Sequence, residues 1–242
     1  MVKEHYDKHL GRVYSWMLGD FQEKMSEQRD FFINHGIVSA PDKIAFDLGA
    51  GNGIQSVALA HLGFIVKAVD FNKQLLEELN ANKQTLPIST FEMDIRTFLY
   101  EAEECPELIV CMGDTLTHFK DYAEVKDLIQ KMASILPDRG KLIFSFRDLS
   151  DERKGGDRFF HLKSDDTRTM SCFLEYFPHH VLVHDLLIEK IAGKWTQAVG
   201  SYPKLRIPAP LFKKTLAENS IAILFEEKVS GMTCITGQKI KR

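Results

Sequence analysis

The segment FDLGAGNG, from Phe46 to Gly53, constrains the fold of this chain more than any other feature. An apolar pattern typical of a buried strand leads into an acidic residue, and three glycines follow at alternate positions. Glycine permits positive φ angles and lets a ligand approach the main chain closely. A helical pattern over 54–61 comes next, and the free N–H groups of a helix N-terminus attract anions. The segment therefore predicts a ligand site at a strand–helix junction.

A second acidic position points to a nucleoside ligand. The strand pattern 64–69 ends in Asp70, and a carboxylate at such a tip can accept two hydrogen bonds from a ribose diol. The G-x-G-x-x-G fingerprint of dinucleotide sites would need a glycine where Ile54 stands. No Gly-Lys-Ser/Thr follows, so the P-loop pattern is absent as well. These residues together indicate a nucleoside site on an open α/β sheet.

Size and composition limit the remaining possibilities. A chain of 242 residues suits one domain, with room for an elaborated insert. A net charge of −3 gives no electrostatic reason to expect nucleic acid as the main partner. No apolar run reaches the ~18 residues of a membrane span, and the charged start lacks a signal-peptide pattern. Four scattered cysteines without CxxC spacing predict reduced thiols in a cytoplasmic protein, and no metal site is expected.

Strand and helix patterns alternate through the first 150 residues. A helix is expected over 5–35, before the glycine-rich segment. Alternation of strands and helices implies right-handed βαβ units and a mostly parallel sheet. The expected strands are 43–48, 64–69, 88–93, 107–112 and 140–146, and the expected helices are 54–62, 72–83, 95–101 and 121–136.

The pattern changes after Leu149. Period-two alternation within 158–207 predicts an antiparallel meander, with segments 158–162, 167–177, 180–191 and 194–205. A helix over 211–219 and a hairpin formed by 221–229 and 232–240 complete the chain.

The chain resembles the class I S-adenosylmethionine-dependent methyltransferases, and in particular those that act on small molecules. The segment 46–53 matches the first motif of the family, and Asp70 matches its second. Segments 92–95 and 111–118 resemble the acidic turn beside the adenine and the fourth strand end. The resemblance implies an α/β fold: a three-layer Rossmann-like sheet, mostly parallel with an antiparallel last strand, plus an antiparallel β insert.

The resemblance also divides the single domain, 1–242, into functional parts. Residues 1–40 form an N-terminal helical cap, and 40–150 with 208–242 form the cofactor-binding core. The insert, 151–207, serves either as a substrate cap, with Tyr176, His180, Tyr202 or Arg206 over the site, or as the surface of a homodimer.

S-adenosylmethionine is the cofactor that the resemblance implies. The glycine loop would hold its amino-acid part, Asp70 its ribose, and Asp94 the adenine amino group, unless Asp94 serves as a helix N-cap. Asp47 either contacts the ligand or ties the glycine loop. Tyr14 would cover the sulfonium or pack in the core. The full expected cofactor set is Asp47, Gly49, Ala50, Gly51, Gly53, Asp70, Phe71, Asp94, Ile95, Met112, Gly113 and Tyr14.

Three residues are candidates for catalysis. Methyl transfer is an in-line displacement that depends mainly on positioning, although a base can help an amine or phenol acceptor. His118 is the candidate base, or else a polar residue at a helix start. Asp114 would orient a polar substrate or cap the following turn. Arg147 would hold a carboxylate or pair with Asp148 or Asp151.

The predicted function is therefore methyl transfer to a small-molecule amine, hydroxyl or carboxylate. Methylation of protein or RNA is the first alternative, and a cofactor-binding protein without catalysis is the second. No Asn-Pro-Pro-Tyr or Asp-Pro-Pro-Tyr stands at 112–115, which argues against the branches of the family that modify adenine or glutamine.

Overall fold

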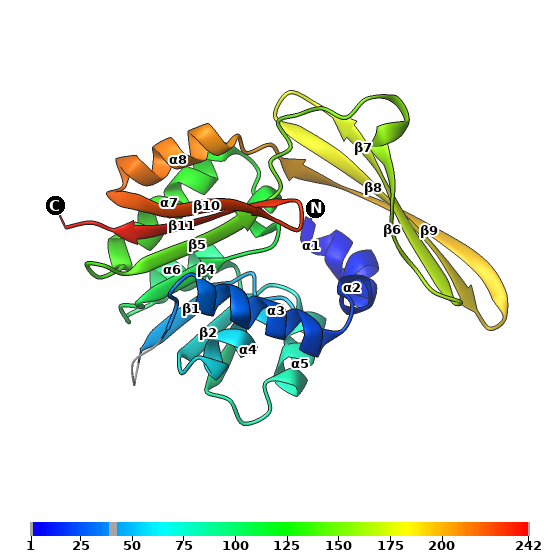
Figure 1. Ribbon diagram of the computed structural model, residues 1–242. Coiled ribbons are helices and arrows are strands. Elements are labelled where there is room, and N and C mark those ends of the chain that lie inside the picture. Colours follow the sequence, from blue (N-terminus) through cyan, green and yellow to red (C-terminus); the bar gives the residue numbers. More distant parts are fainter. Residues whose placement is uncertain (1, 39–42, 242) are drawn as a thin grey trace.

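The computed structural model describes residues 2–38 and 43–241 (Figure 1). Seven strands form its main sheet, in the order β10-β11-β5-β4-β1-β2-β3. The five parallel strands are followed by the antiparallel β11, which confirms the expected sheet. The strands are β1 (Ile44–Leu48), β2 (Ile65–Asp70), β3 (Ile88–Glu92), β4 (Leu108–Cys111), β5 (Lys141–Phe146), β10 (Ile221–Val229) and β11 (Met232–Lys239).

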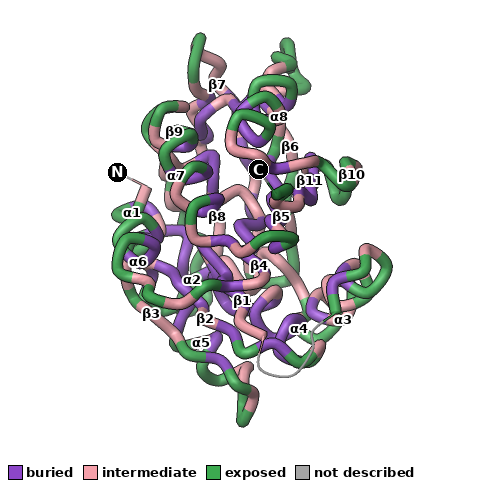
Figure 2. Tube along the Cα trace, turned by 90° about the vertical axis from the view of Figure 1, so that its left-hand side faces the viewer, coloured by how far each residue is buried: buried purple, intermediate pink, exposed green. Residues whose placement is uncertain are grey.

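Helices cover both faces of this sheet, because its central strands are apolar on both sides. The first face packs against α3 (Phe21–Asn34), α4 (Ile54–His61) and α5 (Lys73–Asn82). The second packs against α6 (Ile95–Glu101), α7 (Tyr122–Ile135) and α8 (Ala209–Glu218). Along β5, Leu142 and Phe144 enter one core while Ile143 enters the other, as the period of two requires. Figure 2 shows the buried residues running along these central strands.

The N-terminal region corrects one expectation. In place of one helix over 5–35, the chain forms α1 (Val2–His5), a π-helical turn η1 (Tyr6–Leu10), α2 (Gly11–Leu18) and then the separate helix α3. The break falls at Gly19, whose φ of 103° lies outside the helical region. Asp20 then caps α3 by accepting a hydrogen bond from the Glu23 N–H at 2.8 Å.

A second, four-stranded antiparallel sheet confirms the expected meander. Its strands, in spatial order, are β6 (Phe159–Ser164), β7 (Arg168–Tyr176), β8 (His180–Ile191) and β9 (Lys194–Leu205). In Figure 1, α1 and α2 lie between this sheet and the main sheet. Leu10 and Val13 pack against Met170, Val183 and Leu187 on the inner face of the second sheet. The N-terminal helices thus supply the apolar cover that the insert lacks on its own.

A buried polar contact fixes the N-terminal helices on the second sheet. His5 Nε2 lies 3.0 Å from Asp185 Oδ2, and the Cys172 thiol donates to Asp185 Oδ1 at 2.8 Å. Gly200 on β9 makes room for this contact, since a Cβ there would lie 2.5 Å from His5 Cε1 and 3.0 Å from His9 Cδ2. Within the described residues, no helix is both long and apolar enough to cross a membrane.

Candidate active site

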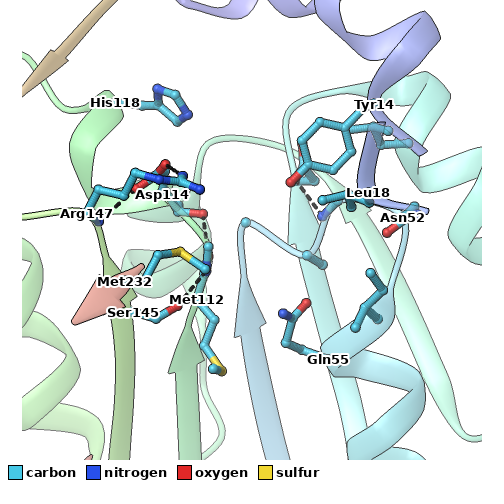
Figure 3. A pocket seen from close by; sticks show the side chains of 18 of the residues that line it. Tyr14, Leu18, Asn52, Gln55, Met112, Asp114, His118, Ser145, Arg147 and Met232 are labelled. Carbon is cyan, nitrogen blue, oxygen red and sulfur yellow. Dashed lines mark hydrogen bonds and ion pairs between the residues drawn. The ribbon is translucent and has the colours of Figure 1, made fainter. Parts of the chain in front are cut away.

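A cavity of about 530 Å³ opens at the carboxyl ends of β1, β2, β4 and β5. This is the point at which the strand order reverses, where open α/β sheets bind their ligands. Figure 3 shows Tyr14, Leu18 and Asn52 on one side of the cavity and Asp114 and Arg147 on the other. The wall thus combines the core, the N-terminal helices and, through Tyr202 and Lys204, strand β9.

The glycine loop leaves main chain bare toward this cavity. Gly49, Gly51 and Gly53 have φ angles of 81°, 53° and 94°, which L side chains rarely adopt. The Gly49 and Ala50 N–H groups donate to the Val69 carbonyl at 2.8 and 3.0 Å, which joins the loop to β2. Gly49, Ala50 and Gly51 line the cavity, whereas Gly53 lies behind them, and a Cβ on Gly53 would lie 2.5 Å from Leu79 Cγ.

Asp70 lines the cavity and also ties the glycine loop. Its carboxylate accepts from the Gly51 N–H at 2.9 Å and from the Asn72 N–H at 2.8 Å. Burial raises the pKa of Asp70, and these backbone donors act against the rise. A carboxylate has lone pairs beyond the two that are used here, so it can still accept from a ligand.

Asp47 is placed differently from its expected ligand contact. It is 1% exposed and accepts from the Ser56 hydroxyl at 2.6 Å, which ties β1 to α4. Among the described residues, it does not belong to the cavity wall. Burial raises the pKa of Asp47 to about 7, the Ser56 hydrogen bond acts against the rise, and Asp70 adds to it. The structure therefore gives Asp47 a structural role at the junction of β1 and α4.

Asp94, Ile95 and Phe71 line the cavity beside the end of β3. Asp94 caps α6, accepting from the Arg96 N–H at 2.8 Å, and its carboxylate also receives the Arg96 guanidinium at 2.8 and 2.9 Å. These Arg96 contacts lower the pKa of Asp94. The N-cap role is therefore present, and the same side chain remains on the cavity wall.

The N-terminal helices close the cavity over the glycine loop. Tyr6 and Tyr14 both line it, with ring centroids 6.0 Å apart. The Asn52 amide donates to the Ser15 hydroxyl at 2.9 Å, and the Asn72 amide donates to Asp7 at 2.9 Å. Burial raises the pKa of Tyr14 to about 12, so its hydroxyl stays protonated. These ties place Tyr14 against the cavity, as expected for a residue that covers a ligand.

An ion cluster forms the opposite end of the cavity. The Asp114 carboxylate accepts from the Lys204 ammonium at 2.6 Å, from the Arg147 N–H at 2.9 Å and from the Arg147 guanidinium. Burial alone would raise the pKa of Asp114, but the two cations hold it well below its usual range. Gly113, whose N–H donates to the Ser145 hydroxyl at 2.8 Å, lines the cavity beside this cluster, as does Met112.

The sequence-based alternative roles for Arg147 and Asp114, a salt bridge with a neighbouring acid and a turn cap, were both wrong. Arg147 pairs with Asp114, on the neighbouring strand end, and not with Asp148 or Asp151. Its nearest sequence neighbour, Asp148, instead accepts from the backbone N–H of Ser150. Asp114 does precede the 3-10 turn η2 (Thr115–His118), but its side chain makes no capping hydrogen bond. The carboxylate is engaged by cations instead.

His118 lies in the roof of the cavity, above Asp114 and Arg147 (Figure 3). Its Nε2 is 3.3 Å from the Tyr6 hydroxyl, and its buried Nδ1 has no hydrogen-bond partner. Burial, together with the Lys204 charge, lowers the pKa of His118 to about 3. The imidazole is therefore neutral at physiological pH, with one unmatched nitrogen.

Of the four residues that were expected over the site, Tyr202 lines the cavity, whereas Tyr176, His180 and Arg206 do not. Lys204, which was not anticipated, also lines the cavity. Arg206 instead donates to the carbonyls of Phe177 and Ser150, at 2.9 and 2.7 Å, and so connects the two ends of the insert.

Over residues 2–38 and 43–241, no group of His, Cys, Asp and Glu side chains suits a metal ion.

Residues 45–140 match a family described as "Methyltransferase domain". This match identifies residues 45–140 as a methyltransferase domain. The fold of the whole chain, including this methyltransferase domain, is similar to that of an S-adenosylmethionine-dependent methyltransferase from Clostridium acetobutylicum. The TM-score is 0.74 at 16% identity, and the match covers 98% of this chain and 97% of the other. An amino pentose methyltransferase from Micromonospora echinaspora gives a TM-score of 0.76 at 11% identity, over 96% and 97% of the two chains.

Two relatives align with the methyltransferase domain in sequence. A glycine/sarcosine N-methyltransferase from Aphanothece halophytica is 26% identical over 154 residues, which are 60% of this chain and 56% of the relative. A ubiquinone biosynthesis O-methyltransferase from Coxiella burnetii is 32% identical over 110 residues, 45% of each chain. The chain thus spans about half the length of the curated relatives that it matches.

Proposed function

We propose that this protein transfers the methyl group of S-adenosylmethionine to a small-molecule acceptor. The observation that carries the proposal is the two-ended cavity at the sheet's switch point. One end has bare glycine main chain with Asp70 and Asp94, and the other has the Asp114 ion cluster. The first end suits an adenosyl amino acid, and the second suits a polar acceptor.

The residues of the first end suit this cofactor. A Cβ on Gly51 would project toward Tyr14 Cε1, 3.6 Å away, so glycine leaves a slot between the loop and the ring. The N-terminus of α4 would favour the cofactor carboxylate. Asp70 would accept from the ribose hydroxyls, and Ile95 and Phe71 would contact the adenine. The structural relatives include methyltransferases with bound S-adenosylmethionine or S-adenosylhomocysteine.

The chain's own part in the reaction is positioning and exclusion of water. When bound, the cofactor supplies a sulfonium methyl group that is open to in-line attack. Tyr6 and Tyr14 shield the cavity from solvent, and their rings suit a cationic sulfur. His118, which is neutral and whose Nε2 lies 3.3 Å from the Tyr6 hydroxyl, would hold Tyr6 over the cavity rather than remove a proton from the acceptor.

The size of the cavity, about 530 Å³, favours a small acceptor over protein or RNA. The N-terminal helices and β9 both contribute to its wall, so the second sheet is proposed to act as a substrate cap. The relatives are consistent with small acceptors, since they include enzymes named for glycine and sarcosine, for ubiquinone biosynthesis and for an amino pentose.

Calorimetry tests the cofactor, and a labelled-methyl assay tests the transfer. The folded protein is titrated with S-adenosylmethionine and with S-adenosylhomocysteine, and binding of both is expected. It is then incubated with methyl-labelled cofactor and pooled metabolites, with glycine and sarcosine as single acceptors. Absence of binding would refute the cofactor assignment, and binding without transfer to any pool would favour the non-catalytic alternative.

A further inference from the structure

Lys204 is a buried cation that comes from outside the cofactor-binding core. It stands on β9 of the second sheet, and its side chain is 11% exposed. Its ammonium lies 2.6 Å from Asp114 Oδ2, although the two residues are 90 positions apart. Taking an ammonium out of water is costly unless an anion and hydrogen bonds compensate. The second sheet therefore places a positive charge in the cavity wall, and the desolvation of the Lys204 ammonium has an energetic cost.

Asp114 does not balance the cations that surround it. Its single carboxylate, 8% exposed, faces both Lys204 and Arg147. The other cations of the described cavity wall have their own partners: Lys24 pairs with Glu27, and Arg96 pairs with Asp94 and Glu124. At this end of the cavity, one carboxylate therefore serves two cations. The sulfonium of the proposed cofactor would add a further positive charge.

We propose that Lys204 and Arg147 together hold a carboxylate of the methyl acceptor, and that the second sheet selects the acceptor in this way. This inference rests on the proposed function of the cavity. The Arg147 side chain is 48% exposed, so part of its planar fork of donors is free for a bidentate contact. The ammonium has three donors, and the structure shows one of them on Asp114.

The same charges would prepare an amine acceptor for attack. A nucleophilic amine must lose its proton, and nearby positive charge disfavours the protonated form. Lys204, Arg147 and the sulfonium would all act in this direction, opposed by Asp114. A separate general base is then unnecessary, which agrees with the neutral state of His118.

Binding of simple probes tests the inference without knowledge of the natural acceptor. Protein saturated with S-adenosylhomocysteine is titrated at low ionic strength with acetate, with the neutral isostere acetamide and with inorganic phosphate. Acetate is expected to bind, and acetamide and phosphate to bind more weakly. Lys204→Met should weaken acetate binding about 10- to 100-fold, the effect of losing a charged hydrogen bond. Lys204→Arg should retain most of it.

Lys194→Met is the matched control, because Lys194 is an exposed residue of the same strand. It should bind acetate like the unmodified protein. Equal binding of acetate and acetamide, or unchanged acetate binding by a folded Lys204→Met variant, would overturn the inference. Tighter binding of phosphate would contradict the carboxylate assignment. Failure of S-adenosylhomocysteine to bind would instead count against the proposed function, and acetate titration of the unloaded protein would still test Lys204.

Discussion

The Tyr6 hydroxyl lies 3.3 Å from Nε2 of His118, and the two residues are 112 positions apart in the chain. Their rings meet edge to face at 5.5 Å between centroids. The contact joins the N-terminal helices to the turn that follows β4, directly over the cavity. The roof of the cavity thus depends on a contact between the N-terminal helices and the cofactor-binding core.

This contact leads to a prediction about pH dependence. Because the pKa of His118 is lowered to about 3, the imidazole stays neutral above that pH. His118→Gln should lower the turnover number about fivefold, the worth of one neutral hydrogen bond. The shape of the pH–rate profile between about pH 5 and 9 should not change. Loss of an acid limb near neutrality in the variant would show instead that His118 acts as a titrating base.

Removal of the Asp70 carboxylate should weaken cofactor binding. Asp70→Ala deletes the proposed ribose contact and also the acceptor of the Gly51 and Asn72 N–H groups. A loss of about 1.5–3 kcal/mol in the free energy of binding S-adenosylhomocysteine is expected, measured by calorimetry. Asp157→Asn changes an exposed acid outside the cavity wall and should bind normally. Unchanged affinity in Asp70→Ala would remove the ribose role.

Asp47 should make the fold less stable as pH rises. Its pKa is about 7 in the folded protein, against an ordinary value of 3.8. Between these values the folded chain binds more protons than the unfolded chain, so the free energy of unfolding falls with increasing pH, by an amount on the order of 4 kcal/mol. Above about pH 7 the contribution is constant.

Urea unfolding of the unmodified protein and of Asp47→Asn at about pH 5 and pH 8 measures this effect. The amide cannot ionise, but it can still accept from Ser56. The variant should therefore lose less stability between the two conditions. Parallel losses in the two proteins would mean that Asp47 titrates normally in the fold.

Gly200→Ala should loosen the N-terminal helices. Its Cβ would lie 2.5 Å from His5 Cε1, and His5 is held by Asp185. Such overpacking typically costs about 1–3 kcal/mol of stability. Faster amide hydrogen exchange over residues 2–18 and weaker cofactor binding are expected. Gly156→Ala is the control, since a Cβ there meets nothing within 4 Å; equal exchange in the two variants would contradict the prediction.

Local sequence patterns were sufficient to predict most of the fold. Strand and helix positions in the core agree with the structure to within a few residues, because buried strands and amphipathic helices have characteristic apolar periods. The expected helix over 5–35 was wrong, because Gly19 leaves the helical region and Asp20 starts a new helix. The helical period of apolar residues alone does not reveal such a break between two helices.

The partners in the ion cluster were not predictable in this way. Asp148 and Asp151 are the acids closest to Arg147 in sequence, yet Arg147 binds Asp114, because parallel pairing of β4 with β5 brings the two strand ends together. Lys204 had no motif to mark it. Alternation along β9 could assign it to a face of the second sheet, but not to a carboxylate 90 positions away.

The sequence by itself determined the sheet, the bare glycine loop and the acid at the tip of β2, since each depends on residues that are neighbours in the chain or on a regular period. Only the tertiary structure decided which charges meet at the acceptor end, what closes the cavity and which protonation state His118 adopts. Those properties depend on burial and on distances between side chains from separate elements, and both arise only when the second sheet and the N-terminal helices pack against the core.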